Sequence, residues 1–156
     1  MGIFRYRMQS ILNIKIKMET QAKQEFASAK KALDDEVEKL QILFQRKSEY
    51  EDEARRLLAG ALNVLEITAN KEAILRMEEY ITLQQQAVER AKDKVEDARA
   101  KLKEVMQERE IQEKLREKAF ENFLAEEKAL EGKEIDQLTS YTYSKRIQYN
   151  NAVNGD

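Results

Sequence analysis

The sequence predicts an all-α protein, folded as a long antiparallel coiled-coil hairpin of two helices. The chain of 156 residues contains no proline and only four glycines, so little in it interrupts a helix. Apolar residues recur every seven positions in two long segments, which is typical of helices that pack along a narrow seam. The connection around Gly60 is too short to let the second helix run parallel to the first.

The first helix is expected over about residues 4–58. Two sets of positions, each repeating every seven residues, form its predicted seam. Val37 and Phe44 lie one step off this seam, so the apolar stripe is expected to widen there. The seam residues are Phe26, Leu33, Leu40, Lys47 and Ala54 in one set, and Ala22, Ala29, Glu36, Leu43, Tyr50 and Leu57 in the other.

The predicted turn covers about residues 59–63. Gly60 suits the left-handed residue that often closes a helix, and Asn63 with Glu66 resembles a capping box that opens the next helix. A hairpin folded here pairs residues whose numbers sum to about 123, which sets Leu33 near Val88. The alternative is a single helix that kinks at Gly60 and forms a parallel homodimer.

The second helix is expected over about residues 64–145, within a single coiled-coil domain over 1–149. Near Arg109 the heptad register is expected to fail at a stutter, with the stripe resuming at Ile111, Leu115, Ala119 and Phe123. Residues 150–156 lack periodicity and are predicted to be disordered. The seam positions before Arg109 are Ile67, Ile74, Ile81, Val88, Val95 and Leu102, with Met77, Gln84, Ala91, Ala98 and Val105 alternating between them.

The second helix is predicted to be longer than the first, so its last part lacks a partner in the same chain. The overhang is expected to begin after about Lys118. It carries apolar residues that suit a docking site for another protein. These residues are Phe120, Phe123, Leu124, Leu130, Ile135 and Leu138.

The composition argues against an enzyme and against several other classes of protein. The sequence contains no cysteine and no histidine, which removes the usual zinc ligands and the usual nucleophile pairs. We therefore expect no catalytic residue, no cofactor and no metal. The net charge of −2 arises from interspersed charges, so no basic face for nucleic acid is expected. The N-terminal residues form no apolar signal or anchor, which favours a cytoplasmic protein.

Two segments are candidates for binding. The stretch from Phe4 to Ile16 mixes apolar and basic residues and is compatible with a helix lying on a membrane. Packing of this stretch against residues 115–123 of the second helix is the favoured interpretation. Just after the turn, Tyr80, Leu83 and Ala87 form an off-seam stripe at helical spacing, which indicates a groove for a partner protein.

The sequence resembles the FliJ family of the bacterial flagellar type III export apparatus over nearly its whole length. Three segments carry the resemblance, in this order along the chain. They are Phe4-Arg5-Tyr6-Arg7-Met8-Gln9-Ser10-Ile11-Leu12, then Glu79-Tyr80-Ile81-Thr82-Leu83-Gln84, and finally Leu115-Arg116-Glu117-Lys118 followed by Glu127-Lys128, Glu131 and Lys133-Glu134-Ile135-Asp136-Gln137-Leu138.

The resemblance implies a non-enzymatic coiled-coil stalk at the cytoplasmic face of the inner membrane, which assists delivery of substrates and export chaperones. One end of the stalk enters the ring of the hexameric export ATPase FliI, which implies contacts from Phe4, Tyr6, Met8, Phe120, Phe123, Leu124 and Leu130. The other end meets the export gate protein FlhA through Tyr80, Leu83, Gln84 and Ala87, although an apolar residue is expected at Gln84. A homodimeric structural coiled coil and a membrane-surface helical protein are the alternative functions.

Overall fold

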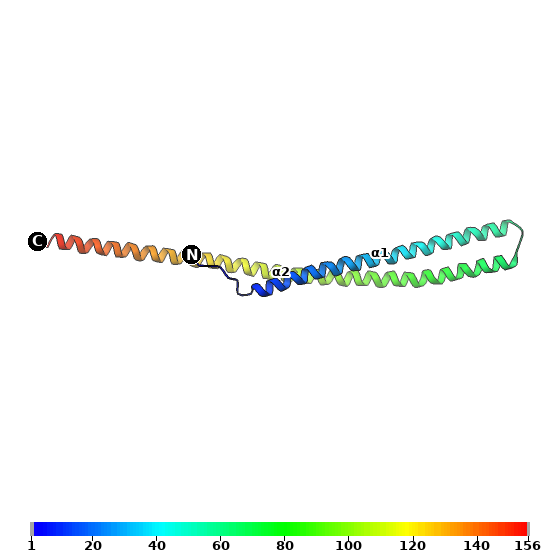
Figure 1. Cartoon of the computed structure of the whole chain (residues 1–156), viewed down its shortest axis with the longest axis horizontal. Coiled ribbons are helices and arrows are strands. Elements are labelled where there is room, and N and C mark those ends of the chain that lie inside the picture. The colour runs from blue at the N-terminus through cyan, green and yellow to red at the C-terminus, as the bar shows by residue number, and fades with distance from the viewer. Residues whose placement is uncertain (1, 156) are drawn as a thin grey trace. The chain divides into compact units, whose positions relative to one another are not determined.

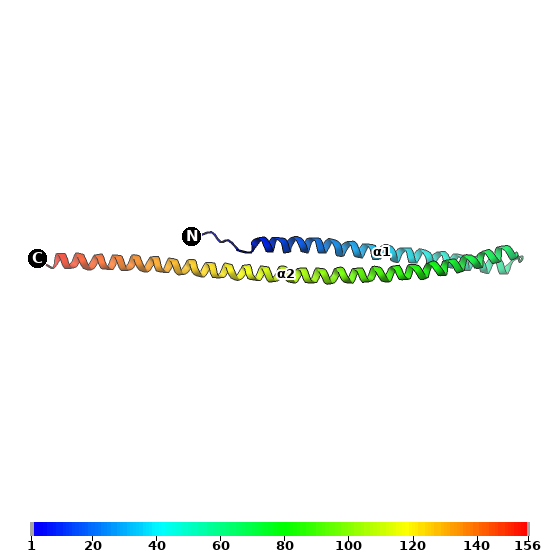
Figure 2. The same ribbon diagram turned by 90° about the horizontal axis from the view of Figure 1, so that it is seen from below.

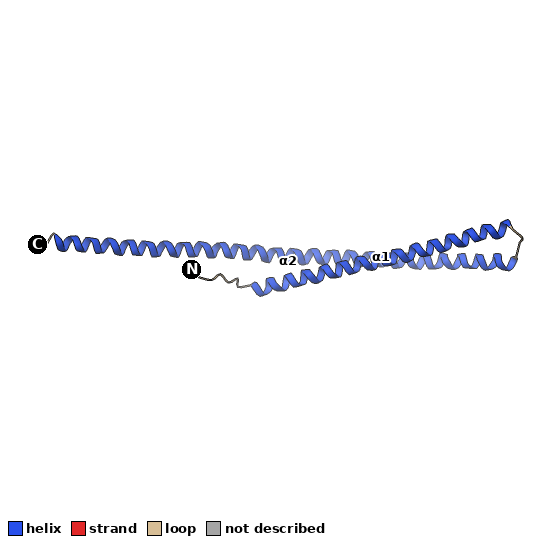
Figure 3. Cartoon of the chain, turned by 45° about the horizontal axis from the view of Figure 1, so that its top comes forward, coloured by secondary structure: helices blue, strands red, loops and turns tan. Residues whose placement is uncertain are grey.

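Two α-helices account for most of the chain (Figure 1). The computed structural model describes residues 2–155, with α1 over Gln9–Ala59 and α2 over Val64–Val153. The described residues contain no strand, and residues 60–63 connect the two helices (Figure 3). The helices run antiparallel from this connection. The predicted all-α helical hairpin is confirmed.

The chain divides into two compact units. Lys17–Gln107 forms the first, called the hairpin unit below, and the described residues 2–16 and 108–155 form the second, called the terminal unit. Each unit contains a piece of α1 and a piece of α2. The single domain expected over 1–149 stays a prediction, and its first residue, Met1, lies outside the described residues.

The seam of the hairpin unit follows the predicted heptads. Every predicted seam position from Ala22 to Leu57 and from Ile67 to Val105 is buried or half-buried. The pairing also agrees with the prediction, because Lys47 reaches Glu78 at 3.5 Å and the Arg99 guanidinium lies 5.7 Å from the ring centroid of Phe26. The most buried apolar side chains are Ala22, Ala73, Met77, Ile81, Val88, Ala91, Val95 and Val105.

The turn confirms Asn63 as a helix cap and corrects the prediction for Gly60. The Asn63 side-chain oxygen accepts the backbone N–H groups of Leu65 at 3.1 Å and Glu66 at 3.3 Å, as expected of an N-cap. Gly60 does not adopt the left-handed conformation, since no glycine among residues 2–155 has a positive φ. α1 ends at Ala59 and the chain leaves it through a bend at Gly60, so no left-handed residue is needed there.

α1 begins at Gln9 and not near Phe4 as predicted. Residues 2–6 are not helical, and a turn in which the Gln9 N–H donates to the Tyr6 carbonyl at 3.1 Å precedes the helix. An extended chain advances about 3.3 Å per residue, against about 1.5 Å in a helix, so it carries Phe4 farther along α2. Alternate residues of an extended chain share a side, which lets Phe4 and Tyr6 both contact α2. The segment gains these contacts in place of helical hydrogen bonds.

The later part of α2 corrects two expectations, the stutter and the start of the overhang. The heptad register continues without a stutter, because Arg109, Gln112, Ala119 and Phe123 are half-buried while Ile111 and Leu115 are exposed. Polar side chains at two seam positions disguised the repeat. The exposed overhang begins after Glu127, since the extended N-terminal segment covers part of α2 up to that residue (Figure 2).

α2 also extends beyond its predicted end near residue 145. It is helical through Val153, including the first residues of the predicted disordered tail. No proline or glycine interrupts residues 133–153, so the backbone can continue as a helix. Asp156, the last residue of that predicted tail, lies outside the described residues.

Candidate interaction surfaces

Two of the four residues expected to meet the export gate point away from the hairpin seam. The side chains of Tyr80 and Leu83 are 47% and 59% exposed, whereas their neighbour Ile81 is buried in the seam. Leu83 borders a shallow groove on α2. The groove is lined by Leu75, Arg76, Glu78, Glu79, Thr82 and Leu83. This flank of the hairpin unit therefore presents the exposed parts of Tyr80 and Leu83 beside charged and polar side chains.

The other two residues of this set face α1. The Gln84 amide donates to the backbone carbonyl of Glu36 at 2.9 Å and also to the Glu36 carboxylate. This hydrogen bond from Gln84 lowers the pKa of the Glu36 carboxyl below its usual range. Ala87 is half-buried and lies beside Ala29 and Ala91 where the helices approach. The structure therefore divides the predicted set into an outward pair and an inward pair.

The terminal unit holds an aromatic cluster that joins its two chain segments. The ring of Phe4 lies 5.0 Å from that of Phe120, edge to face, and 5.5 Å from that of Phe123. The Arg116 guanidinium stacks 5.6 Å from the Phe4 centroid. The Tyr6 hydroxyl is 3.1 Å from the Gln112 side-chain oxygen, and donates to it. The predicted packing of the N-terminal stretch against residues 115–123 thus matches the contacts seen.

The residues expected to meet the ATPase ring differ in exposure. Phe4, Tyr6 and Phe123 are half-buried in the aromatic cluster of the terminal unit. Those that remain exposed are Met8, Phe120, Leu124 and Leu130. The exposed members, and above all Leu124 and Leu130 on α2, are available to another protein, while the half-buried ones hold the terminal unit together.

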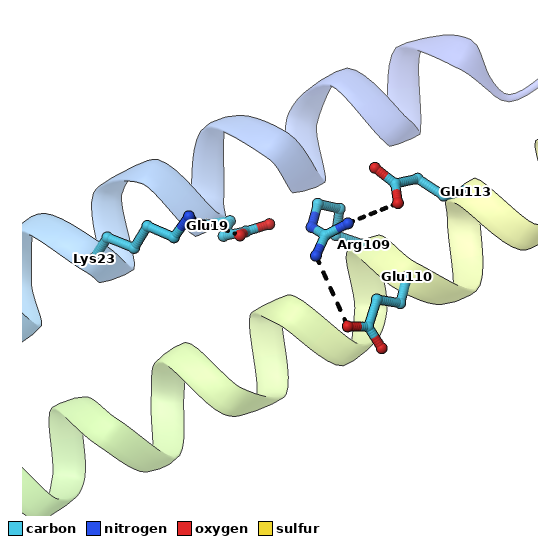
Figure 4. Close-up of polar contacts among 5 residues, drawn as sticks. All are labelled: Glu19, Lys23, Arg109, Glu110 and Glu113. Carbon is cyan, nitrogen blue, oxygen red and sulfur yellow. Dashed lines mark hydrogen bonds and ion pairs between the residues drawn. The ribbon is translucent and has the colours of Figure 1, made fainter.

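Charged side chains along α2 complete the terminal unit. Arg109 pairs with Glu113 at 2.6 Å and with Glu110 at 3.8 Å (Figure 4), and Lys15 of α1 pairs with Glu108 at 2.8 Å. The seam role of Arg109 was missed in the sequence. The signal that could have found it is its distance of seven residues from Leu102.

The tip of the hairpin unit carries an apolar surface that the sequence-based reasoning also missed. Leu58, Leu62, Val64 and Leu65 are exposed around the connection between the helices. A cavity of about 340 Å³ lies beside Leu58 and is lined by Ala54, Leu57, Leu58, Ile67, Asn70, Lys71, Ile74 and Leu75. The signal was the absence of any charged residue from 57 to 65. Asn70, one of the lining residues, donates its side-chain amide to the Tyr50 carbonyl at 2.9 Å.

Residues 2–155 provide neither a cluster of metal-binding side chains nor a segment that could span a membrane. No group of three or more histidine, cysteine, aspartate or glutamate side chains is placed to hold a metal ion among them. Over the same residues, neither helix contains a stretch long and apolar enough to cross a bilayer.

These features define a class of protein, an antiparallel coiled coil with exposed apolar side chains on both of its units. The chain belongs to the FliJ family, because the family model described as Flagellar FliJ protein matches residues 4–148. This membership points to a component of flagellar type III protein export. The FliJ family is one of non-enzymatic export components.

A solved structure supports the fold. The chain is similar to the structure of a putative YscO homolog, CT670, from Chlamydia trachomatis, with a TM-score of 0.62 and 21% sequence identity. The similarity covers 94% of this chain and 99% of that chain. No curated protein matches the sequence significantly.

Proposed function

We propose that this chain is a stalk that links the hexameric export ATPase FliI to the export gate protein FlhA. It works at the cytoplasmic face of the inner membrane and assists delivery of substrates and their chaperones to the gate. The observation that carries the proposal is the outward pair Tyr80 and Leu83, which lies beside a seam whose own apolar residues are buried or half-buried. Family membership supplies the export context.

The gate contact is assigned to the hairpin unit. Fully burying an exposed side chain of this size contributes roughly 1.5–3 kcal/mol, and about half of that remains to be gained at each of Tyr80 and Leu83, which are 47% and 59% exposed. The inward pair has a different role, because Gln84 holds Glu36 of α1 beneath this surface. A gate protein docking here meets a flank that is already fixed by contacts between the helices.

The ATPase contact is assigned to the terminal unit. Its aromatic cluster fixes the N-terminal segment on α2, and Leu124 and Leu130 remain exposed on the same helix. An apolar helix surface of this kind suits insertion into a ring lined by apolar side chains. ATP is hydrolysed by the ring, and the stalk transmits or biases its motion.

The gate assignment is tested by binding of the double variant Tyr80→Ala and Leu83→Ala to a cytoplasmic fragment of FlhA. The matched control is Ile42→Ala with Phe44→Ala, an aliphatic and aromatic pair of comparable exposure on α1. We expect the first variant to lose at least tenfold in affinity, with unchanged helicity, and the control to bind normally. Equal binding of both variants refutes the assignment.

The ring assignment is tested by the effect of the chain on ATP hydrolysis and ring assembly by FliI. Leu124→Ala with Leu130→Ala changes exposed residues, while Phe120→Ala with Phe123→Ala also removes contacts of Phe4. We expect both variants to weaken the stimulation and the Tyr80 and Leu83 variant to retain it. Full stimulation by both ring variants contradicts the assignment.

A further inference from the structure

The last part of α2, from residue 128 onward, is an exposed helix on which no other segment of the chain packs. Every residue from 128 to 155 is exposed, and this part of α2, coloured orange to red, extends past the N-terminal segment of the terminal unit (Figures 1 and 2). The long-range contacts of the terminal unit end at the pair formed by the Gly2 N–H and Glu127. The remainder of the helix has only local contacts, such as Lys145 over the ring of Tyr141 at 5.3 Å.

The residue types in this segment indicate a helix that is stabilised by packing against a second helix. Positions 139–144 read Thr-Ser-Tyr-Thr-Tyr-Ser, and all six residues are weaker helix formers than alanine, leucine, glutamate or lysine. Most helical stability in proteins comes from packing of an apolar face and not from propensity. A helix of this composition therefore gains from a partner along its length.

An apolar stripe shows where that partner packs. Leu124, Ile135, Leu138 and Tyr149 follow one another at spacings of 11, 3 and 11 residues. Eleven residues are about three helical turns, so the four side chains share one face. All four are exposed, Leu138 to 67%. Lys128, Glu131, Thr142 and Lys145 lie on the same face between these apolar residues, so a partner along this face meets both apolar and charged side chains.

The acidic first half of the segment and its basic second half would attract each other if two copies of the segment lay side by side in opposite directions. Residues 126–136 contain five acidic and two basic side chains, whereas the charged residues of 137–155 are Lys145 and Arg146 alone. Two parallel copies would place like charges together. Two antiparallel copies place Lys145 and Arg146 of one chain beside Glu131 and Glu134 of the other.

We propose that the C-terminal part of α2 is a self-association surface, which pairs with the same segment of a second copy in antiparallel orientation. The two-fold axis passes near Leu138, midway between Glu131 and Lys145. Such an interface uses the same patch on both chains, so it closes as a dimer and does not grow into a filament. This proposal does not depend on the ring assignment, although both would use the face that carries Leu124.

Charge reversal in the full-length chain tests the pairing. One variant carries Glu131→Lys with Glu134→Lys, and the other carries Lys145→Glu with Arg146→Glu. We expect sedimentation equilibrium to show twice the monomer mass for the unchanged chain at high concentration, a monomer for each variant alone, and a dimer again when the two variants are mixed. A chain that stays monomeric as its concentration rises overturns the proposal, as does a mixture that does not dimerise.

Cysteine cross-linking distinguishes antiparallel from parallel pairing. The sequence contains no cysteine of its own, so only the introduced thiols can form a disulfide. Leu138→Cys places two thiols near the two-fold axis, where a disulfide can form. Tyr149→Cys separates the thiols of antiparallel copies by roughly 30 Å, at about 1.5 Å per residue. We expect a cross-linked dimer with Leu138→Cys and none with Tyr149→Cys. Efficient cross-linking through both positions indicates parallel pairing and overturns the proposal.

Discussion

Truncation of Val95 to alanine tests whether the hairpin unit is held together by the heptad seam. The Val95 side chain is 5% exposed, at the seam position seven residues after Val88. The same substitution at Val64, which is 75% exposed beside the turn, provides a matched control. Both changes remove the same atoms, so a difference between them reports burial.

The expected cost follows from the burial of Val95. Replacing valine with alanine removes two carbon groups, each contributing about 0.8 kcal/mol when buried, which gives roughly 1.6 kcal/mol. A cavity that the helices only partly close adds up to about 1 kcal/mol. We expect Val95→Ala to lower the free energy of unfolding by about 2 kcal/mol, a large part of the stability of an ordinary domain.

The assay is urea unfolding of the full chain, followed by circular dichroism at a helical wavelength. We expect Val64→Ala to change the unfolding free energy by less than about 0.5 kcal/mol, as is usual for exposed positions. Equal effects of the two substitutions would mean that burial of Val95 in the seam contributes no more to stability than the exposed Val64 at the start of α2.

The remaining predictions concern a polar seam contact, the N-terminal segment and a helix cap. Because the Gln84 hydrogen bond lowers the pKa of Glu36 in the folded chain, its stabilising effect is present above the ordinary carboxyl pKa and is lost as pH falls through the lowered value. Gln84→Leu should therefore reduce the difference between unfolding midpoints measured at neutral and acidic pH; an unchanged difference counts against the hydrogen bond. Phe4→Ala should increase proteolysis and hydrogen exchange of residues 2–8 several-fold, since two ring contacts worth about 0.5–1.5 kcal/mol each are lost, while exposed Ile3→Ala should not. Asn63→Ala should cost about 1 kcal/mol in urea unfolding, and no loss would exclude a capping role for its side chain.

The hairpin and its seam were predictable from the sequence because the heptad spacing is a geometric property of packed helices. Ile81, Val88 and Val95 were predicted at the seam from their heptad spacing, and that spacing is what buries them against the other helix. Even polar members of the repeat, such as Glu36 and Gln84, lie at the seam, where they bond to each other. Their spacing predicted their place, although it did not predict their hydrogen bond.

The predictions that proved wrong are those that rested on the type of a residue and not on its heptad position, together with the predicted start of α1. Arg109 and Gln112 keep the heptad register, but their polarity suggested a stutter. Gly60 suggested a left-handed cap, although glycine permits that conformation and does not require it. The extended entry before Gln9 depends on contacts of Phe4 with residues more than a hundred positions away, which no local pattern contains.

The candidate surfaces were partly predictable from helical periodicity. Tyr80 and Leu83 are off the seam, and their exposure follows from helical periodicity. Their role in binding is not a consequence of periodicity and stays a proposal. The heptad repeat placed Gln84 at the seam, facing α1. The resemblance of the segment Glu79–Gln84 to the FliJ family instead implied that Gln84 faces the export gate.

Simultaneous capture of both partners tests whether one chain links the export ATPase to the export gate. A cytoplasmic fragment of FlhA is immobilised, and retention of FliI is measured with and without this chain. We expect FliI to be retained only when the chain is present, and Tyr80→Ala with Leu83→Ala to abolish the retention. If FliI instead displaces the chain from the gate fragment, the two partners share one surface and the chain does not link them.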